Sequence, residues 1–253
     1  MRKILIIGIG AGNPDYITVQ AINALNQADV FFIPDKGTEK AALQRIRKEI
    51  CERFIENANY RIVDVKTPQR AERSSNYRAS VDEWHARLEA NWEGLFMEEL
   101  AEGECGAFLV WGDPTLYDST LRIIEKLRSK GFALEYDVIP GITAVQALAA
   151  RHRVALNRIG EPVLITTGRR LAEGFPNNLD SVVVMLDGDQ AFKRVASDDL
   201  DIYWGAYLGT EDEILVAGKL REVMGDIERI KHQARDEKGW IMDTYLLRKG
   251  EPG

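Results

Sequence analysis

The segment GIGAGNPD at residues 8–15 follows the apolar run Ile4–Ile7 and precedes a helical pattern that begins near Thr18. A continuous run of β-branched residues and leucine that ends in glycine is typical of a strand buried on both faces of a sheet. The segment therefore indicates a loop at the carboxyl end of a parallel strand, followed by a helix. In open α/β sheets, this is the edge at which ligands bind.

Two further segments have the same setting. WGDPTLY at residues 111–117 ends the apolar run Cys105–Trp111, and IPGITA at residues 139–144 follows the run Leu134–Val138. A helical pattern follows each of them. Because the carboxyl ends of parallel strands meet at one edge of a sheet, we expect the three loops to gather at a single site.

The periodicity of the chain changes near Val138. Before it, strand and helix patterns alternate, which predicts a parallel sheet with helices on both faces. After it, closely spaced strand candidates indicate a mixed, partly antiparallel sheet. These candidates are Val163–Thr166, Ser181–Leu186, Ile202–Leu208, Glu213–Ala217 and Trp240–Leu247. We expect an α/β protein of two domains, residues 1–138 and residues 139–253, with a ligand cleft between them.

The composition argues against several classes of partner. The 253 residues include 33 basic and 40 acidic side chains, a net charge of −7, whereas nucleic acid or an anionic membrane surface requires a positive field. No apolar run reaches the roughly 18 residues of a membrane span. Cys51 and Cys105 form neither a disulfide framework nor a zinc motif. We therefore expect no bound metal and a cytoplasmic location, where thiols stay reduced.

The first loop also resembles part of a dinucleotide-binding fingerprint. Gly8 and Gly10 have the required spacing, and Asp35 ends the next strand, where an acid would bind a ribose. However, the third glycine of the fingerprint is replaced by Asn13, and Pro14 delays the start of the helix. A nicotinamide-dependent oxidoreductase is therefore the weaker alternative. A non-catalytic binding module would not need three loops at one edge.

Together the three loops resemble those of the S-adenosylmethionine-dependent tetrapyrrole methyltransferases. In that family the first loop reads Gly-x-Gly-Pro-Gly-Asp-Pro, and the following helix ends in Ala-Asp-Val. Here Ala11 replaces the proline and Asn13 the aspartate, and Ala28–Val30 follows at the expected distance. The resemblance extends over essentially the whole chain, so it implies the two-domain α/β fold of the family.

The resemblance implies S-adenosylmethionine as the methyl donor and assigns residues to its binding. Glycine permits a close approach of backbone to ligand. Thr143 can cap the next helix and direct backbone amides toward a carboxylate, although capping alone would also explain it. The donor-binding residues implied in this way are Ala11, Gly112, Asp113, Leu116, Thr143, Ala144, Leu186 and Leu208.

The resemblance also implies a tetrapyrrole substrate that carries acetate and propionate side chains. Arginine suits such a substrate because its planar guanidinium pairs with carboxylates through two hydrogen bonds. Arg169 and Arg170 follow the end of a predicted strand, and we expect them, with Asp15, to bind the substrate. Asp35 aligns with an aspartate of the family that faces the macrocycle. It is the candidate catalytic residue, as a general base or as an acceptor for a pyrrole N–H; the alternative is a helix cap.

Three segments indicate the branch of the family. WGDPTLYDST at residues 111–120, VMLDGD at 184–189 and YWGAYLG at 203–209 resemble the enzymes of cobalamin biosynthesis that methylate precorrin-5 at C-1 and release acetate. The nearest alternative is methylation of precorrin-2 at C-20. The resemblance also implies a homodimer.

Overall fold

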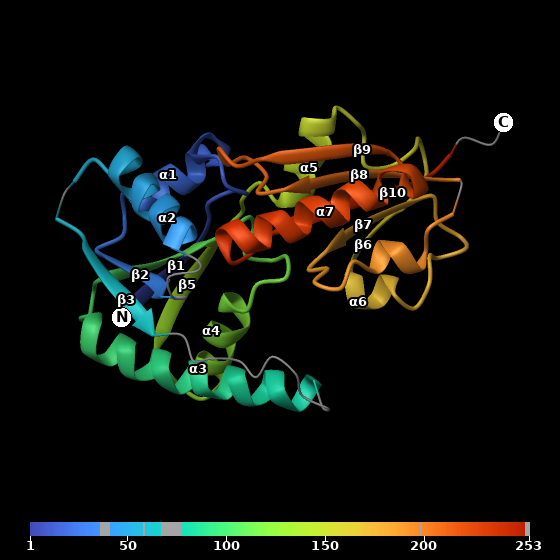
Figure 1. The fold of residues 1–253 in the computed structure, drawn as a ribbon. Coiled ribbons are helices and arrows are strands. Elements are labelled where there is room, and N and C mark those ends of the chain that lie inside the picture. The colour runs from blue at the N-terminus through green and yellow to red at the C-terminus, as the bar shows by residue number, and fades with distance from the viewer. Residues whose placement is uncertain (36–40, 58, 67–76, 198, 251–253) are drawn as a thin grey trace. The chain divides into compact units, whose positions relative to one another are not determined.

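The structure is a computed structural model that describes residues 1–35, 41–57, 59–66, 77–197 and 199–250. Its contacts divide the chain into two compact units (Figure 1). The first unit comprises Met1–Gly10 and Pro14–Thr143, and the second comprises Ala11–Asn13 and Ala144–Gly253. The predicted division into independent domains after residue 138 stays a prediction. No helix in the described part of the chain is long and apolar enough to cross a membrane.

The first unit is built on a five-stranded sheet in the order β3-β2-β4-β1-β5. All of its strand pairs are parallel, as the alternation of strand and helix patterns predicts. The strands are β1 (Arg2–Gly8), β2 (Val30–Asp35), β3 (Arg61–Lys66), β4 (Cys105–Val110) and β5 (Leu134–Ile139). The glycine loops thus follow β1, β4 and β5, which are neighbours in the sheet.

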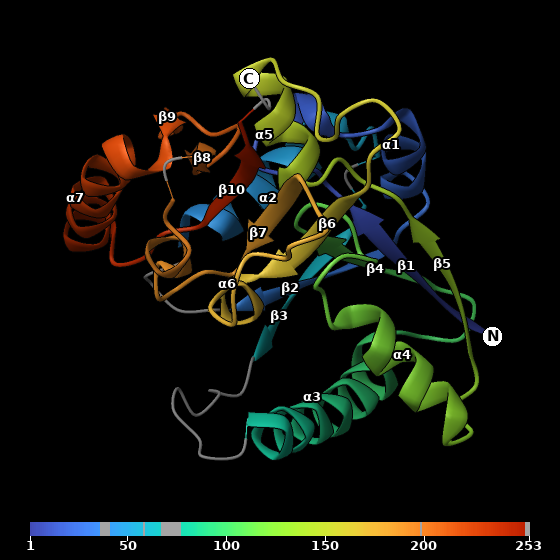
Figure 2. The same cartoon turned by 90° about the vertical axis from the view of Figure 1, so that its right-hand side faces the viewer.

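Helices cover both faces of this sheet (Figures 1 and 2). Side chains of successive residues in a strand point to opposite faces. Accordingly Ile4 and Ile6 of β1 pack into the cluster of α3 and α4, whereas Leu5 and Ile7 pack against α1 and α2. These helices are α1 (Val19–Leu25), α2 (Ala41–Phe54), α3 (Tyr77–Glu99) and α4 (Thr120–Ser129), and a 3-10 turn, η1 (Pro14–Tyr16), precedes α1.

The second unit is built on a mixed sheet in the order β6-β7-β10-β8-β9. Only the β6–β7 pair is parallel. All five strands correspond to predicted ones: β6 (Val163–Thr167), β7 (Ser181–Met185), β8 (Leu200–Ala206), β9 (Ile214–Lys219) and β10 (Asp243–Lys249). The α/β class with one parallel and one mixed sheet is therefore confirmed.

Both faces of the mixed sheet are also covered. α6 (Gly168–Leu171), the 3-10 turn η3 (Ala191–Arg194) and the long α7 (Leu220–Lys238) share one apolar cluster with β7, β8 and β10. On the other face α5 (Ala144–His152) contacts β8, β9 and β10. The helix α7, which separates β9 from β10 in the sequence, is not among the predicted elements.

A buried lysine joins α7 to the sheet of the second unit. Lys231 is 1% exposed, and its Nζ donates hydrogen bonds to Asp243 Oδ2 at 2.7 Å and to the carbonyl of Asp187 at 3.0 Å. Trp204 Nε1 donates to the same Asp243 oxygen, and the Tyr245 hydroxyl donates to Asp187 Oδ2 at 2.6 Å. A buried charge is tolerated when it is paired and hydrogen-bonded in this way. The network holds the loop that follows β7.

Candidate active site

The three glycine loops of the first unit meet backbone to backbone. A Cβ atom on Gly8 would lie 2.7 Å from the amide nitrogen of Gly141 and 2.9 Å from the carbonyl oxygen of Gly112, and one on Gly141 would clash with that same oxygen. Any side chain at either position would force the loops apart. Gly8 and Gly141 are therefore required for packing, because only glycine allows two backbones to approach so closely.

Gly112 plays a different part in the same cluster. Its amide donates to the carbonyl of Gly10 at 2.8 Å, and the amide of Gly10 donates back at 3.3 Å. Gly112 has a φ of +71°, in the left-handed region that favours glycine. A Cβ there would have a single neighbour within 4 Å among the described atoms, the Cα of Thr143 at 3.7 Å. There is thus unfilled space beside Gly112, on the side that faces Thr143.

Asp113 fastens the second loop to the third. Its Oδ2 accepts a hydrogen bond from the amide of Gly141 at 2.8 Å. Its Oδ1 accepts one from the amide of Thr115 at 2.8 Å and one from the Thr115 hydroxyl at 2.5 Å. Burial alone would raise the pKa of Asp113, but these hydrogen bonds outweigh it and the pKa lies below its ordinary value. The carboxylate therefore stays ionised and serves the geometry of the loops.

Two other predicted donor-binding residues belong to the same loops, Leu116 to the second and Thr143 to the third. Leu116 is half-buried, and its amide donates to the carbonyl of Asp113 at 3.2 Å. Thr143 is buried and stands immediately before α5, whose first residue is Ala144. The structure thus brings Gly112, Asp113, Leu116 and Thr143 together. Their part in donor binding stays a prediction.

In the second unit, Gly12 brings two further predicted segments together. Gly12 has a φ of +125°, and a Cβ on it would clash with the carbonyl of Leu208 and lie 2.8 Å from Thr210 Cγ2. The loop that contains Ala11 therefore lies against the loop that contains Leu208. Both of these side chains are buried, so a ligand would contact their backbone rather than their side chains.

Leu186 belongs to a third loop of the second unit. It follows β7, has a φ of +55° and is 65% exposed. A leucine in this conformation is strained and persists only when its surroundings hold it. Here the next residue, Asp187, belongs to the Lys231 network. The predicted contact of Leu186 with the donor stays a prediction.

The predicted substrate-binding residues are on the surface. Asp15 forms an ion pair with Arg53 at 2.6 Å. Arg169 and Arg170 are exposed on α6 at the carboxyl end of β6, and Arg170 pairs with Glu173 at 3.1 Å. Exposed ion pairs of this kind are weak, so these side chains can exchange partners for a substrate carboxylate.

Asp35 is the last residue of β2, at the carboxyl edge of the parallel sheet, and is in register with Lys66 of β3. Its side chain lies outside the described residues. The structure therefore confirms where Asp35 stands in the strand, and its catalytic part stays a prediction.

Arg47 of α2 is not among the predicted site residues, although the structure buries it. Only 5% of its surface is exposed, and its guanidinium donates to two backbone carbonyls. Arg47 is four residues after Leu43 and three before Ile50, on the apolar side of the helix. A cation within an apolar stripe of period 3.6 is the signal that could have revealed it.

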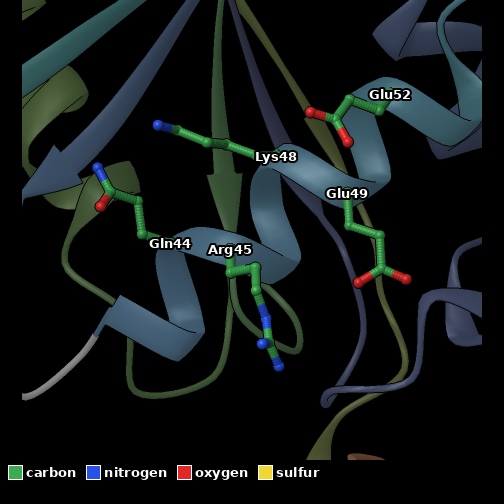
Figure 3. A pocket seen from close by; sticks show the side chains of 5 residues that line it. All are labelled: Gln44, Arg45, Lys48, Glu49 and Glu52. Atoms are coloured by element: carbon green, nitrogen blue, oxygen red, sulfur yellow. The ribbon is translucent and has the colours of Figure 1, made fainter.

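The opposite side of α2 is polar (Figure 3). A shallow hollow of about 440 Å³ is lined there by Gln44, Arg45, Lys48, Glu49 and Glu52. All five side chains come from this one helix, so the hollow is a part of the helix surface and is unrelated to the glycine loops.

The chemistry available to the cysteines is limited. Both are free thiols, and burial raises the pKa of Cys51 to about 12 and that of Cys105 to about 11. A thiolate is the reactive form of cysteine, so neither residue suits a nucleophile. Within the described ranges, no three His, Cys, Asp or Glu side chains are grouped so that they could hold a metal ion.

Comparison with known proteins identifies the family. The model of the tetrapyrrole (corrin/porphyrin) methylases matches residues 3–224. The chain belongs to the tetrapyrrole methylase family. It is therefore a methyltransferase that depends on S-adenosylmethionine, as the glycine loops predict.

Two relatives illustrate the range of this family. A precorrin-6A synthase (deacetylating) from Sinorhizobium is 56% identical over 251 residues, which cover 99% of this chain and 96% of the relative. A cobalt-precorrin-2 C(20)-methyltransferase from Methanocaldococcus jannaschii is 24% identical over 229 residues, which cover 89% of this chain and 91% of the relative.

Solved structures agree with the fold. A cobalamin-synthesis-related protein from Corynebacterium diphtheriae is 41% identical and superimposes with a TM-score of 0.83, covering 98% of this chain and 99% of its own. A uroporphyrin-III C-methyltransferase from Thermus thermophilus, solved with S-adenosylhomocysteine, has a TM-score of 0.59 at 16% identity. The match covers 98% of this chain and 97% of that structure. At that identity the second likeness supports the fold alone.

Asp113→Asn should destabilise the protein, because an amide cannot accept all three hydrogen bonds. We expect a loss of about 1–3 kcal/mol in the free energy of unfolding at neutral pH, the usual effect of leaving a buried donor unsatisfied. A depressed pKa in the folded state stabilises above the unfolded pKa, near 3.9, and this contribution is lost as the pH falls through the folded value. The difference between the proteins should therefore shrink below about pH 4.

Urea unfolding at a series of pH values measures this difference. Asp137→Asn is the control, because Asp137 forms only an exposed ion pair with Lys3. A variant at position 113 within about 0.5 kcal/mol of wild type at pH 7 would show that the carboxylate does not hold the loops.

Proposed function

We propose that this chain is a precorrin-6A synthase of the deacetylating type, which acts in cobalamin biosynthesis. It methylates precorrin-5 at C-1, with S-adenosylmethionine as methyl donor, and releases acetate to give precorrin-6A. The observation that carries the proposal is the 56% identity to the Sinorhizobium enzyme over 99% of the chain. The precorrin-2 C-20 alternative has much weaker support, since two relatives named for that position are 24% and 27% identical.

The glycine loops of the first unit suit the methyl donor. Gly112 leaves open space beside Thr143, while Gly8 and Gly141 hold the surrounding backbone close. Backbone amides and carbonyls in such a loop can bind the amino and carboxylate groups of the methionine part. When bound, the donor supplies an electrophilic methyl group on a sulfonium. The loops then orient that methyl group toward the ring carbon, so that the transfer is effectively unimolecular.

Asp35 is the proposed catalytic residue. Residue 35 ends β2, and the carboxyl end of this strand belongs to the same sheet edge as the glycine loops. A carboxylate side chain there has two possible uses. It can accept a hydrogen bond from a pyrrole N–H, or accept a proton from the water that attacks the acetyl carbon. Addition of that water and cleavage of the bond between the ring and the acetyl carbon give acetate. Arg169, Arg170 and Asp15 are proposed to bind the side chains of the macrocycle.

Two further properties belong to the proposal. The resemblance to the family favours a homodimer, and light scattering should then give twice the chain mass of 28.5 kDa. The free thiols of Cys51 and Cys105 favour a reducing compartment, and hence the cytoplasm.

The test of the function is turnover by the purified chain. We expect precorrin-5 and S-adenosylmethionine to yield precorrin-6A, S-adenosylhomocysteine and acetate in equal amounts, measured by mass spectrometry and an acetate assay. Precorrin-2 serves as the competing substrate. Methylation of precorrin-2 without turnover of precorrin-5 would overturn the assignment.

Gly112→Ala should weaken donor binding. The new methyl group would occupy the open space beside Thr143, and the positive φ would add about 1–2 kcal/mol of strain. Gly131→Ala is a matched control, because Gly131 also has a positive φ (+94°) and open space, but it follows α4 and lies outside the loops. We expect calorimetry to show S-adenosylhomocysteine binding weakened about tenfold or more in the first variant only. Equal affinities in the two variants would remove the donor from this loop.

Asp35→Asn should leave the affinity for S-adenosylhomocysteine nearly unchanged but slow the chemical steps. Acid–base groups commonly contribute about 100- to 10,000-fold in rate. Single-turnover measurements of methyl transfer and of acetate release would separate the two steps. Asp64→Asn on the neighbouring strand β3 is the control. Rates for Asp35→Asn within a few-fold of wild type would restrict Asp35 to a structural part.

A further inference from the structure

Arg47 occupies a position that would ordinarily be apolar. It lies on the buried side of α2 with Ile50 and Cys51, while the polar residues Arg45 and Lys48 project from the other side (Figure 3). Arginine is almost never fully buried unless it is paired. The side chain therefore requires an explanation beyond the amphipathic pattern of the helix.

Part of the explanation is a missing donor in the sheet. The β2–β4 ladder has its last pair at Phe32 and Phe108. Continuing the same register would bring Pro34 opposite the end of β4, and proline has no N–H to donate. Since the carbonyl of Val110 accepts from Ile9 on the β1 side, that of Leu109 faces β2 and lacks a partner there.

Arg47 supplies that partner. Its Nε donates to the carbonyl of Leu109 at 2.9 Å, and its Nη1 donates to the carbonyl of Leu43 at 3.1 Å. The guanidinium is thereby fixed at the carboxyl edge of the parallel sheet, one residue from the end of β4. The loop Trp111–Tyr117 begins directly beyond that strand. Arg47 thus stands next to the loop that we propose for the donor.

Two carbonyls do not neutralise a positive charge. In the part of the chain that the structure describes, no carboxylate forms an ion pair with Arg47. Asp118 acts on it only at longer range, and its Oδ1 already accepts from the amide of Thr120 at 2.7 Å. Burial lowers the pKa of Arg47 to about 10, so the group is still a cation at neutral pH.

In the described part of the chain a second cation, on α7, is also buried and shows the contrast. Lys231 is paired with Asp243 at 2.7 Å, which compensates the cost of removing its charge from water. A glutamine would supply a hydrogen bond to the carbonyl of Leu109 without any such cost. The charge of Arg47 therefore points to an anion that the described side chains do not provide.

We propose that Arg47 binds a carboxylate of a small-molecule ligand at the carboxyl edge between β2 and β4. The proposal rests on the proposed function for the identity of that ligand. Two ligands of the reaction carry the required group. One is the methyl donor, with its amino-acid carboxylate, and the other is the tetrapyrrole, with its acetate and propionate side chains. A guanidinium suits both, because it can offer a carboxylate parallel N–H donors.

The test compares Arg47→Gln with wild type on three probes. The probes are S-adenosylhomocysteine, its decarboxylated analogue, and uroporphyrin III, a tetrapyrrole that carries acetate and propionate side chains. Arg45→Gln is the matched control, because Arg45 is an exposed residue of the same helix. Calorimetry measures the first two affinities and fluorescence quenching measures the third. Arg47→Lys, which keeps the charge, covers the case in which the glutamine variant does not fold, and thermal unfolding reports on folding.

If Arg47 holds the donor, Arg47→Gln should weaken binding of S-adenosylhomocysteine about 10- to 100-fold and leave that of the decarboxylated analogue unchanged. If it holds the macrocycle, binding of uroporphyrin III should weaken by a similar factor, and the affinity for S-adenosylhomocysteine should persist. Affinities within twofold of wild type for all three probes, in a folded variant, would overturn the proposal. None of these readouts needs turnover of precorrin-5, so failure of the proposed function would be seen separately.

Discussion

The first unit depends on how closely three backbone segments can approach one another. Gly8, Gly112 and Gly141 come from three loops far apart in the sequence, and their contacts leave no room for a Cβ atom on the first or the third. This constraint aligns the carboxyl ends of β1, β4 and β5 and allows the Asp113 carboxylate to reach the amide of Gly141. Gly112, in contrast, has space for further atoms beside Thr143. Packing and the proposed binding of the methyl donor thus use the same residue type for opposite reasons.

Much of the fold could be predicted because its signals are local. Apolar runs bounded by glycine marked β1 and β4, β5 was predicted directly before the third loop, and every strand of the mixed sheet overlaps a predicted one. The strand ends differ by up to three residues, since an end depends on ladder hydrogen bonds to residues that are distant in the sequence. The helix α7 escaped prediction because its buried side includes a charged residue, Lys231, which interrupts the apolar stripe.

The candidate site was predictable in outline and less so in its details. The loops identify the sheet edge, but nothing in the triplet Gly-Asp-Pro tells that Asp113 binds the amide of Gly141, 28 residues away. The arginines singled out in the sequence are those that follow a strand, such as Arg169 and Arg170, and the structure leaves both of them exposed. The role of Arg47 could not be predicted, because it depends on two residues far away in the sequence, a proline in β2 and a carbonyl group in β4. Long-range partnerships of this kind leave little trace in a single sequence.

The proline of β2 links two positions that are 13 residues apart. While residue 34 is proline, the carbonyl of Leu109 must take its hydrogen bond from elsewhere, and Arg47 provides it. A residue with a backbone N–H at position 34 would make that hydrogen bond in the ladder. The carbonyl of Leu109 would then no longer need a donor at position 47. Among homologues, the two positions should therefore covary if the backbone contact alone maintains the arginine. If homologues with a backbone N–H at position 34 still have arginine at position 47, selection acts on the charge of that arginine.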